Sequence, residues 1–193
     1  YVNQYKDHPA ILMWEFGNEF NYHPEWFGGN VDNWYNQLET AAANVKTIDP
    51  NHPVSTGNGE VPSLDVINNC PSVDVWGMNI YRFLNTTSAI TDLASYSDKA
   101  MYISESGADS YNNNSQAENE PQQALATEHI LNTVISYSDL CAGITLFEFC
   151  DEWWKAGDPN SHDTGGFPVS VAYDNFANEE YWGIVNRDRT KKE

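Results

Sequence analysis

Short apolar runs alternate with longer amphipathic stretches along this chain, and that alternation restricts the fold more than any other feature of the sequence. The apolar runs have the length of strands, and the stretches between them have the length of helices. Strands that alternate with helices form parallel sheets, because a parallel connection needs a crossover. The sequence therefore predicts an α/β fold with five strands, at residues 10–16, 53–56, 73–81, 100–104 and 143–149.

Four helices are predicted between these strands, at residues 32–48, 63–69, 88–96 and 122–137. The first has an apolar face at helical spacing, and Pro121 suits the opening turn of the last. That first face consists of Trp34, Leu38, Ala41, Val45 and Ile48. Residues 111–121 are polar and rich in Asn, which predicts an exposed loop. Residues 150–179 form a long aromatic segment, and loops of that length are usually functional.

The charge balance excludes two classes of partner. The chain has 28 acidic against 9 basic residues, a formal net charge of −19, so it repels nucleic acid and anionic membrane surfaces. No apolar run approaches the roughly 18 residues of a membrane span. With 7 Trp, 11 Tyr and 8 Phe, the sequence has enough large side chains to build a core.

The cysteines and sequons give weaker information. Cys70, Cys141 and Cys150 form no CxxC pair, so a structural zinc site is not expected. Cys141 and Cys150 flank a predicted strand at about 30 Å, so at most Cys70 pairs with one of them. Asn-x-Ser/Thr sequons at Asn85 and Asn113 favour a secreted protein, in the extracellular space or periplasm.

Two of the predicted strands end in a carboxylate. Glu19 follows the first strand and Glu105 closes the fourth. Parallel α/β sheets bind ligands at the carboxyl ends of their strands, and two glutamates there form the pair that glycoside hydrolysis uses. The alternative is that both are solvated loop carboxylates.

With these residues the sequence resembles the retaining glycosidases built on the (β/α)8 barrel, and it is most similar to the barrel domain of glycoside hydrolase family 2. The resemblance runs over nearly the whole chain. It depends on Asn18-Glu19 after a Trp-x-x-Gly strand that begins at Trp14, on Gly77-Met78-Asn79-Ile80-Tyr81, on Tyr102-Ile103-Ser104-Glu105-Ser106-Gly107, and on Phe147-Glu148-Phe149-Cys150-Asp151-Glu152-Trp153-Trp154.

The resemblance implies a role for each matched residue. Glu19 would be the acid/base from barrel strand 4 and Glu105 the nucleophile from strand 7, with Asn79 and Tyr81 on strand 6 between them. Asn18 would donate to the sugar 2-hydroxyl. Tyr81 would donate to the nucleophile and favour its ionised form, whereas Glu19 would start protonated. For Tyr81 the alternative is an aromatic side chain at the edge of the core.

Further substrate contacts are expected from Trp14, His23, Glu148, Trp153 and Trp154. Adjacent Trp153 and Trp154 suggest a stacking platform for a pyranose, although one of the two is expected to pack against the barrel instead. His23 and Glu25 follow Glu19 and can line the cleft or lie in a solvated loop. Members of the family often carry a Trp late in strand 8, where this chain has Phe147 and Phe149.

Other kinds of site are not expected. The acidic residues Asp151, Glu152, Asp158 and Asp163 lack the spacing of a calcium loop, so no metal and no cofactor are predicted. Gly57-Asn58-Gly59 lacks a Walker lysine, and no Gly-x-Ser-x-Gly elbow occurs.

If Glu19 closes strand 4, the chain corresponds to the C-terminal part of a barrel. A complete barrel needs about 250 residues. Residues 1–193 are therefore expected to be a portion of a catalytic domain, a partial (β/α)8 barrel of strands 4 to 8. Strands 1 to 3 and helix 8 would lie outside it, and the N-terminal half would be its missing partner.

The leading hypothesis is a retaining β-glycosidase acting on a β-linked oligo- or polysaccharide, with β-glucan favoured. A β-glucan transglycosylase that uses the same residues and a non-catalytic carbohydrate-binding fragment are the alternatives.

Overall fold

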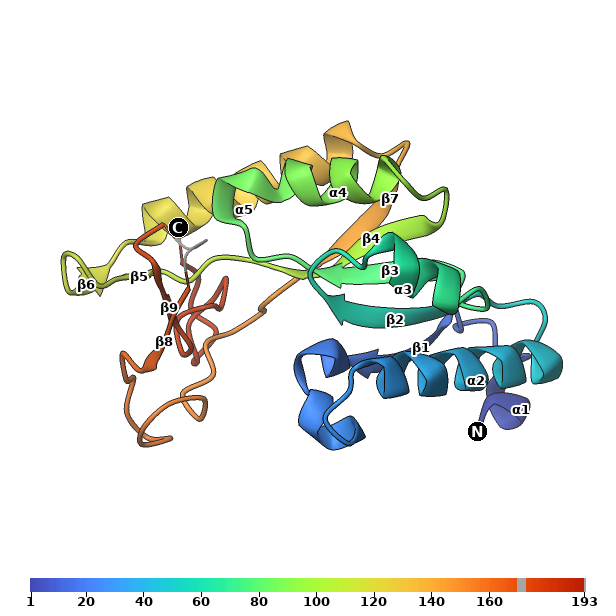
Figure 1. The fold of residues 1–193 in the computed structure, drawn as a ribbon. Helices are drawn as coiled ribbons and strands as arrows, with labels where there is room; N and C mark the ends of the chain where they lie inside the picture. Colours follow the sequence, from blue (N-terminus) through green and yellow to red (C-terminus); the bar gives the residue numbers. More distant parts are fainter. Residues whose placement is uncertain (170–172, 193) are drawn as a thin grey trace. The chain divides into compact units, whose positions relative to one another are not determined.

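The structure is a computed structural model that describes residues 1–169 and 173–192 (Figure 1). Residues 170–172 of the predicted segment 150–179 lie outside the described residues. In chain order the elements are α1 (Val2–Tyr5), β1 (Trp14–Asn18), η1 (Phe20–Tyr22), η2 (Pro24–Phe27), α2 (Asp32–Ile48), β2 (Val54–Gly59), α3 (Leu64–Asn69), β3 (Val75–Asn79), η3 (Phe83–Asn85), α4 (Thr86–Ala94), β4 (Ala100–Ser106), β5 (Tyr111–Asn112), β6 (Ala117–Glu118), α5 (Glu120–Ser136), β7 (Cys141–Leu146), β8 (Gly166–Pro168) and β9 (Phe176–Asn178).

Five parallel strands form one sheet in the order β1-β2-β3-β4-β7. This confirms the predicted α/β fold and its five strands. The bounds differ most in β1, which begins at Trp14 rather than at residue 10. The N–H of Trp14 donates to the Pro53 carbonyl at 3.0 Å, whereas Leu12 before it is 79% exposed. The apolar run at residues 10–16 is therefore longer than the part of it that joins the sheet.

The contacts divide the chain into two compact units, and the first comprises Tyr1–Ile80, Ser88–Ser104 and Ser138–Gly143. Its long helix α2 has the predicted bounds and packs on β2 and α3. Leu38 is fully buried, but Ala42 is buried where Ala41 was expected, and Ile48 is 40% exposed. Trp76, Met78 and Ile80 are also fully buried in this core.

Three helix starts show why the remaining helices form where they do. The Ser63 hydroxyl accepts from the Val66 N–H and caps α3. The Asn119 side chain caps α5, whose first turn contains Pro121 as predicted. Helix α4 begins at Thr86, two residues before the predicted start.

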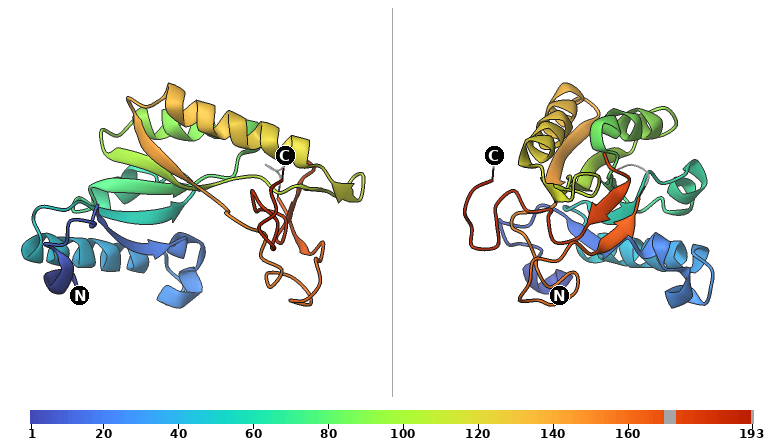
Figure 2. Two further views of the ribbon diagram at one scale, coloured as in Figure 1. Left: turned by 180° about the vertical axis from the view of Figure 1, so that it is seen from behind. Right: turned by 90° about the vertical axis from the view of Figure 1, so that its left-hand side faces the viewer.

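The second unit comprises Tyr81–Thr87, Glu105–Tyr137 and Ile144–Glu193. Short antiparallel pairs occur here that the sequence did not predict: β5 with β6, and β8 with β9, the latter drawn in orange to red in Figure 2. The prediction of an exposed loop at 111–121 holds for residues 114–118 and is wrong at Tyr111, which is buried at the start of the first pair. Strands of two or three residues are too short to show an alternating pattern.

Buried polar groups organise the segment that follows β7. Glu180 is fully buried, and its carboxylate accepts from the backbone N–H groups of Ala156 and Asp163. The side chains of Asp151 and Lys192 are 1% exposed and form an ion pair at 2.8 Å. Backbone that lacks regular secondary structure finds hydrogen-bond partners here through side chains.

All three cysteines are free thiols, with Cys70 and Cys141 buried. Among the residues that the structure describes, no helix is both long enough and apolar enough to span a bilayer. The same part of the chain contains no group of three acidic, histidine or cysteine side chains arranged to hold a metal ion.

Candidate active site

Glu19 lies in a tight turn at the end of β1. Its backbone is left-handed, with φ 56°, and its N–H donates to the Gly57 carbonyl of β2 at 2.8 Å. The turn begins at Gly17, with φ 71°, where a Cβ would lie 2.6 Å from the Trp34 ring. A side chain is therefore excluded at Gly17. A non-glycine residue held at positive φ, as Glu19 is, often marks a functional position.

A chain of hydrogen bonds joins three strands of the first unit next to this turn. The Ser104 hydroxyl donates to Asn79 Oδ1 at 2.6 Å, and Asn79 Nδ2 donates to Asn18 Oδ1 at 2.9 Å. Asn18 reaches β3 by crossing β2 at Gly57, where a Cβ would lie 3.0 Å from its Oδ1. Two predicted site residues, Asn18 and Asn79, are thus in direct contact.

Glu105 is held in the second unit by a phenol. Tyr81 Oη donates to Glu105 Oε2 at 2.8 Å, the contact that the sequence predicted between these side chains. The Tyr81 ring meets Phe147 and Trp182 edge-on, at centroid distances of 6.2 and 5.1 Å. Glu105 therefore lies beside an aromatic cluster of Tyr81, Phe147 and Trp182.

Glu148 is bound by a lysine next to this cluster. Lys155 Nζ forms an ion pair with Glu148 Oε2 at 2.9 Å and lies 3.9 Å from the centroid of the Phe147 ring. Burial raises the pKa of Glu148 to about 7, although its contacts with Lys155 act in the opposite direction. Its Oε1 atom is buried and has no hydrogen-bond partner among the described residues.

Of the two adjacent tryptophans, one is packed and the other is largely exposed, and the packed one contacts side chains of its own segment rather than the barrel. Trp153 stacks on His162 at 5.0 Å, and the Arg187 guanidinium lies 4.8 Å from its ring centroid. Trp154 is 68% exposed. A stacking platform is therefore available on Trp154 and not on Trp153.

His23 lies in the exposed loop after Glu19, which is the second of the two positions predicted for it. Its Nδ1 contacts Glu25 Oε1 at 2.9 Å, and its ring stacks on Trp26 at 3.9 Å. Trp26 is 59% exposed and was not predicted as a site residue. No periodic pattern in the sequence distinguishes Trp26 as a site residue, although its position seven residues after Glu19 could have indicated it.

Trp14 does not lie where the sequence placed it. It begins β1, and its buried indole N–H donates to Asp49 Oδ2 at 2.8 Å. Burial alone would raise the pKa of Asp49, but the hydrogen bonds from Trp14, His52 and the Asn51 backbone outweigh it and lower the pKa to about 2. Trp14 thus packs at the amino end of its strand, and we leave it out of the proposed site.

The fold is glycoside hydrolase-like, with the five parallel strands matching part of a (β/α)8 barrel. The chain is similar to solved structures of a β-glucuronidase from Bacteroides uniformis (TM-score 0.67, 16% identity) and a β-1,3-glucanosyltransferase from Rhizomucor miehei (TM-score 0.63, 17% identity). These likenesses cover 98% and 96% of this chain, but 24% and 64% of the other proteins.

The similarity in sequence is to mannan endo-1,4-β-mannosidases. Mannosidase F from Aspergillus clavatus is 45% identical over 56 residues, and putative mannosidase 4 from Arabidopsis thaliana is 41% identical over 54 residues. The matched segments span 29% and 28% of this chain and 12% of each relative. No family model matches the chain.

Proposed function

We propose that this chain is part of a retaining glycoside hydrolase that cleaves β-linked oligo- or polysaccharides. The observation that carries the proposal is the hydrogen bond from Tyr81 Oη to Glu105 Oε2 at 2.8 Å. A phenol that donates to a carboxylate oxygen fixes the orientation of that carboxylate, which a nucleophile requires. The glycosidase relatives and the barrel-type sheet support this chemistry.

Glu105 is proposed to attack the anomeric carbon and displace the leaving group, which forms a covalent glycosyl ester. Glu19 donates a proton to the departing oxygen and then removes a proton from the water that hydrolyses the ester. Asn18, ordered by Asn79 and Ser104, is placed beside Glu19 in the chain and is proposed to donate to the sugar 2-hydroxyl.

Four further residues are proposed as substrate contacts. Trp154 offers an exposed ring for stacking against a pyranose, and Glu148 offers its buried Oε1 to a hydroxyl. His23 and Trp26 stack on each other in the loop after Glu19.

For the substrate, we propose a β-linked polymer of hexoses, with β-1,4-mannan and β-glucan as the two candidates. The mannosidase relatives favour β-1,4-mannan, whereas the sequence alone favoured β-glucan. Hydrolysis assays on both polymers decide between them. Transglycosylation is the second candidate function, because the glucanosyltransferase shares the fold over 96% of this chain. Longer products formed with an oligosaccharide acceptor would identify it.

We infer extracellular or periplasmic action, supported by the two sequons. In a host that glycosylates, Asn85 is the better acceptor because it is exposed. The side-chain nitrogen of Asn113 instead donates to Asn178 Oδ1 at 2.6 Å and to Asp174 Oδ2 at 3.2 Å.

Replacement of each glutamate in the full-length protein tests the mechanism. Glu105→Ala should lower turnover at least about a thousandfold, and added azide should restore it with an azide product of inverted configuration. Glu19→Ala should spare substrates with good leaving groups, and azide should then give the retained configuration. Unchanged turnover in Glu105→Ala would refute the assignment, and Glu128→Ala, at an exposed position of α5, serves as the control for the removal of a carboxylate.

A further inference from the structure

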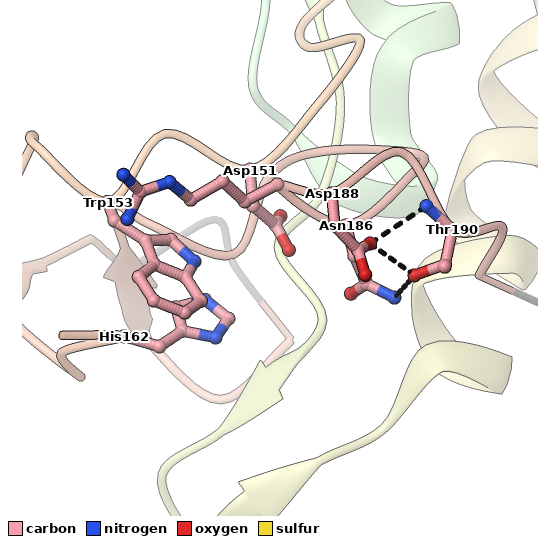
Figure 3. Close-up of a pocket in the computed structure, with 7 residues that line it drawn as sticks. Asp151, Trp153, His162, Asn186, Asp188 and Thr190 are labelled. Carbon is pink, nitrogen blue, oxygen red and sulfur yellow. Dashed lines mark hydrogen bonds between the residues drawn. The ribbon is translucent and has the colours of Figure 1, made fainter. Parts of the chain in front are cut away.

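A pocket of about 560 Å³ lies wholly within the second unit, in the segment that follows β7 (Figure 3). Seven residues line it: Asp151, Trp153, His162, Asn186, Arg187, Asp188 and Thr190. Its volume falls in the range of small-molecule sites, which is about 300–1,000 Å³. None of the roles proposed above uses this pocket.

Two buried polar atoms of the lining residues have no hydrogen-bond partner among the residues that the structure describes. Asp151 Oδ1 accepts from Lys192 Nζ at 2.8 Å and from the Gly183 N–H at 2.9 Å, whereas Asp151 Oδ2 has no described donor. The indole N–H of Trp153 has no described acceptor. Buried polar groups in native proteins are nearly always paired. Eight such unpaired atoms occur among the described residues, and these two belong to the lining of one pocket, where a single ligand group can pair with both.

Two neighbouring side chains cover part of the Trp153 ring. His162 stacks on the ring at an interplanar angle of 16°, and the Arg187 guanidinium also lies over the ring. The group that Trp153 offers for hydrogen bonding is its N–H, which Figure 3 shows on the side of the ring toward the Asp151 carboxylate.

The other side of the pocket is a small polar network. Asp188 Oδ1 accepts from the backbone N–H and hydroxyl of Thr190 at 2.9 and 2.6 Å, and Asn186 Nδ2 donates to the Thr190 hydroxyl. In Figure 3 these three side chains lie together, across from Trp153 and His162. They provide an ordered wall with acceptors available.

The charges of the pocket balance. Two carboxylates, Asp151 and Asp188, and one guanidinium, that of Arg187, line the pocket, and Lys192 forms an ion pair with Asp151. An anion would face two carboxylates, and a cation would face the guanidinium and the indole N–H, so neither gains overall. A neutral ligand with hydroxyl groups suits the pocket, because one hydroxyl can accept from Trp153 and donate to Asp151 at once.

We propose that this pocket binds one hexose residue of a neutral saccharide, with a hydroxyl bridging Trp153 Nε1 and Asp151 Oδ2. The choice of a sugar rests on the proposed function. The pocket itself is a second saccharide site, formed by residues that take no part in the bond cleavage described above. It would hold a distant part of the chain being cleaved, or a separate saccharide.

Indole resonances of the protein test the proposal without turnover. In a titration with mannobiose or cellobiose, the Trp153 Nε1–H signal, assigned by its loss in Trp153→Phe, should move as the N–H gains an acceptor. The Trp76 indole N–H is the internal control, since it is also buried and unpaired but lies in the core of the first unit. Acetate and tetramethylammonium, the charged probes, should leave the Trp153 signal in place.

Asp151→Asn should weaken saccharide binding about tenfold or more, because it replaces a charged acceptor with a donor while keeping Oδ1 for Gly183. The variant also removes the charge that pairs with Lys192, so its folded fraction is measured first by circular dichroism. Trp153→Phe keeps this ion pair and should weaken binding as well, because it removes the N–H. Asp158→Asn is the matched control, since Asp158 lies in the same segment, is exposed and is outside the pocket. Binding is measured by calorimetry in the Glu105→Ala background, so that no substrate is consumed.

A Trp153 signal that stays in place at millimolar saccharide would overturn the proposal, and so would equal affinities of Asp151→Asn and the wild-type protein. A crystal structure with only water or other residues of the chain in the pocket, at saturating saccharide, would do the same. If the full-length protein hydrolyses the saccharide but the Trp153 Nε1–H signal does not shift, this site is rejected and the proposed function stands. If the signal shifts but the full-length protein does not hydrolyse the saccharide, the site stands and the proposed function is rejected.

Discussion

The sheet of the first unit and the segment after β7 are stabilised in different ways. Around the sheet, the fully buried side chains are mostly apolar, as with Leu38, Trp76 and Met78. In the segment after β7, charged side chains are buried instead, including Glu180 and the Asp151–Lys192 pair. Apolar cores tolerate substitutions that conserve volume, whereas a buried charge is strongly destabilising when its partner is removed. The second region should therefore be the more sensitive to single changes and to pH.

The largest effect is expected from breaking the buried ion pair. Lys192→Met leaves Asp151 charged and unpaired, which should destabilise the protein by about 3–5 kcal/mol. The neighbouring Lys191 is exposed, so Lys191→Met should change stability by less than about 0.5 kcal/mol. Urea unfolding of both variants measures the difference, and equal midpoints would show that the charges of this segment do not stabilise it.

The stability of the two regions is expected to depend on pH in opposite directions. Burial raises the pKa of Asp109, in the second unit, to about 7, despite hydrogen bonds from the Asn178 and Tyr111 N–H groups. The unfolded chain loses this proton near pH 4, so folding stability should fall as pH rises from about 4 to 7, by at most about 1.4 kcal/mol per unit. Asp49, in the first unit, has its pKa lowered to about 2, so its contribution is lost only as pH falls from about 4 to 2.

Asp109→Asn checks this assignment by the slope rather than by the absolute stability. The fall between pH 4 and 7 should become shallower in the variant, and the acid loss below pH 4 should stay as it is. Burial also raises the pKa of Glu148, to about 7, and the pKa values of Asp151 and Glu179, so these three groups should account for the part that remains. A slope identical to that of the wild-type protein would mean that Asp109 ionises freely in the folded state.

The smallest effect is expected at Tyr81, and it concerns catalysis rather than stability. Tyr81→Phe removes the donor to Glu105 and keeps the ring against Phe147 and Trp182. The value of kcat/KM should fall about tenfold, the cost of one hydrogen bond to a charged group. Because the ring contacts remain in the variant, its urea unfolding midpoint should stay at the wild-type value. A lower rate accompanied by a matching loss of stability would indicate a packing role alone.

The two regions also differ in how far the sequence predicts them. The helix at 32–48 and the five strands follow from apolar periodicity, since packing around a sheet imposes a regular spacing. The strands β8 and β9 and the charged core of the last segment carry no such spacing. Their positions depend on particular hydrogen bonds, such as those of Glu180, that no pattern reveals.

The candidate site was predictable to the extent that strand ends define it. Glu105 with Tyr81, and Asn18 with Asn79, were each found at the ends of strands and are in contact. Trp14 was misassigned because membership of a strand does not say which end a side chain occupies. The pocket at Asp151 was not foreseen, because it is formed by residues more than 30 positions apart in an irregular segment.

The central claim is that Glu105 is the nucleophile, and covalent trapping tests it most directly. The full-length protein is incubated with a 2-deoxy-2-fluoro-β-glycosyl fluoride of its substrate sugar, digested and mapped by mass spectrometry. A retaining enzyme accumulates the glycosyl ester under these conditions. The account predicts one fluoroglycosyl group, on the peptide that contains Glu105, and no labelling in Glu105→Ala. Stoichiometric labelling of another carboxylate would contradict it.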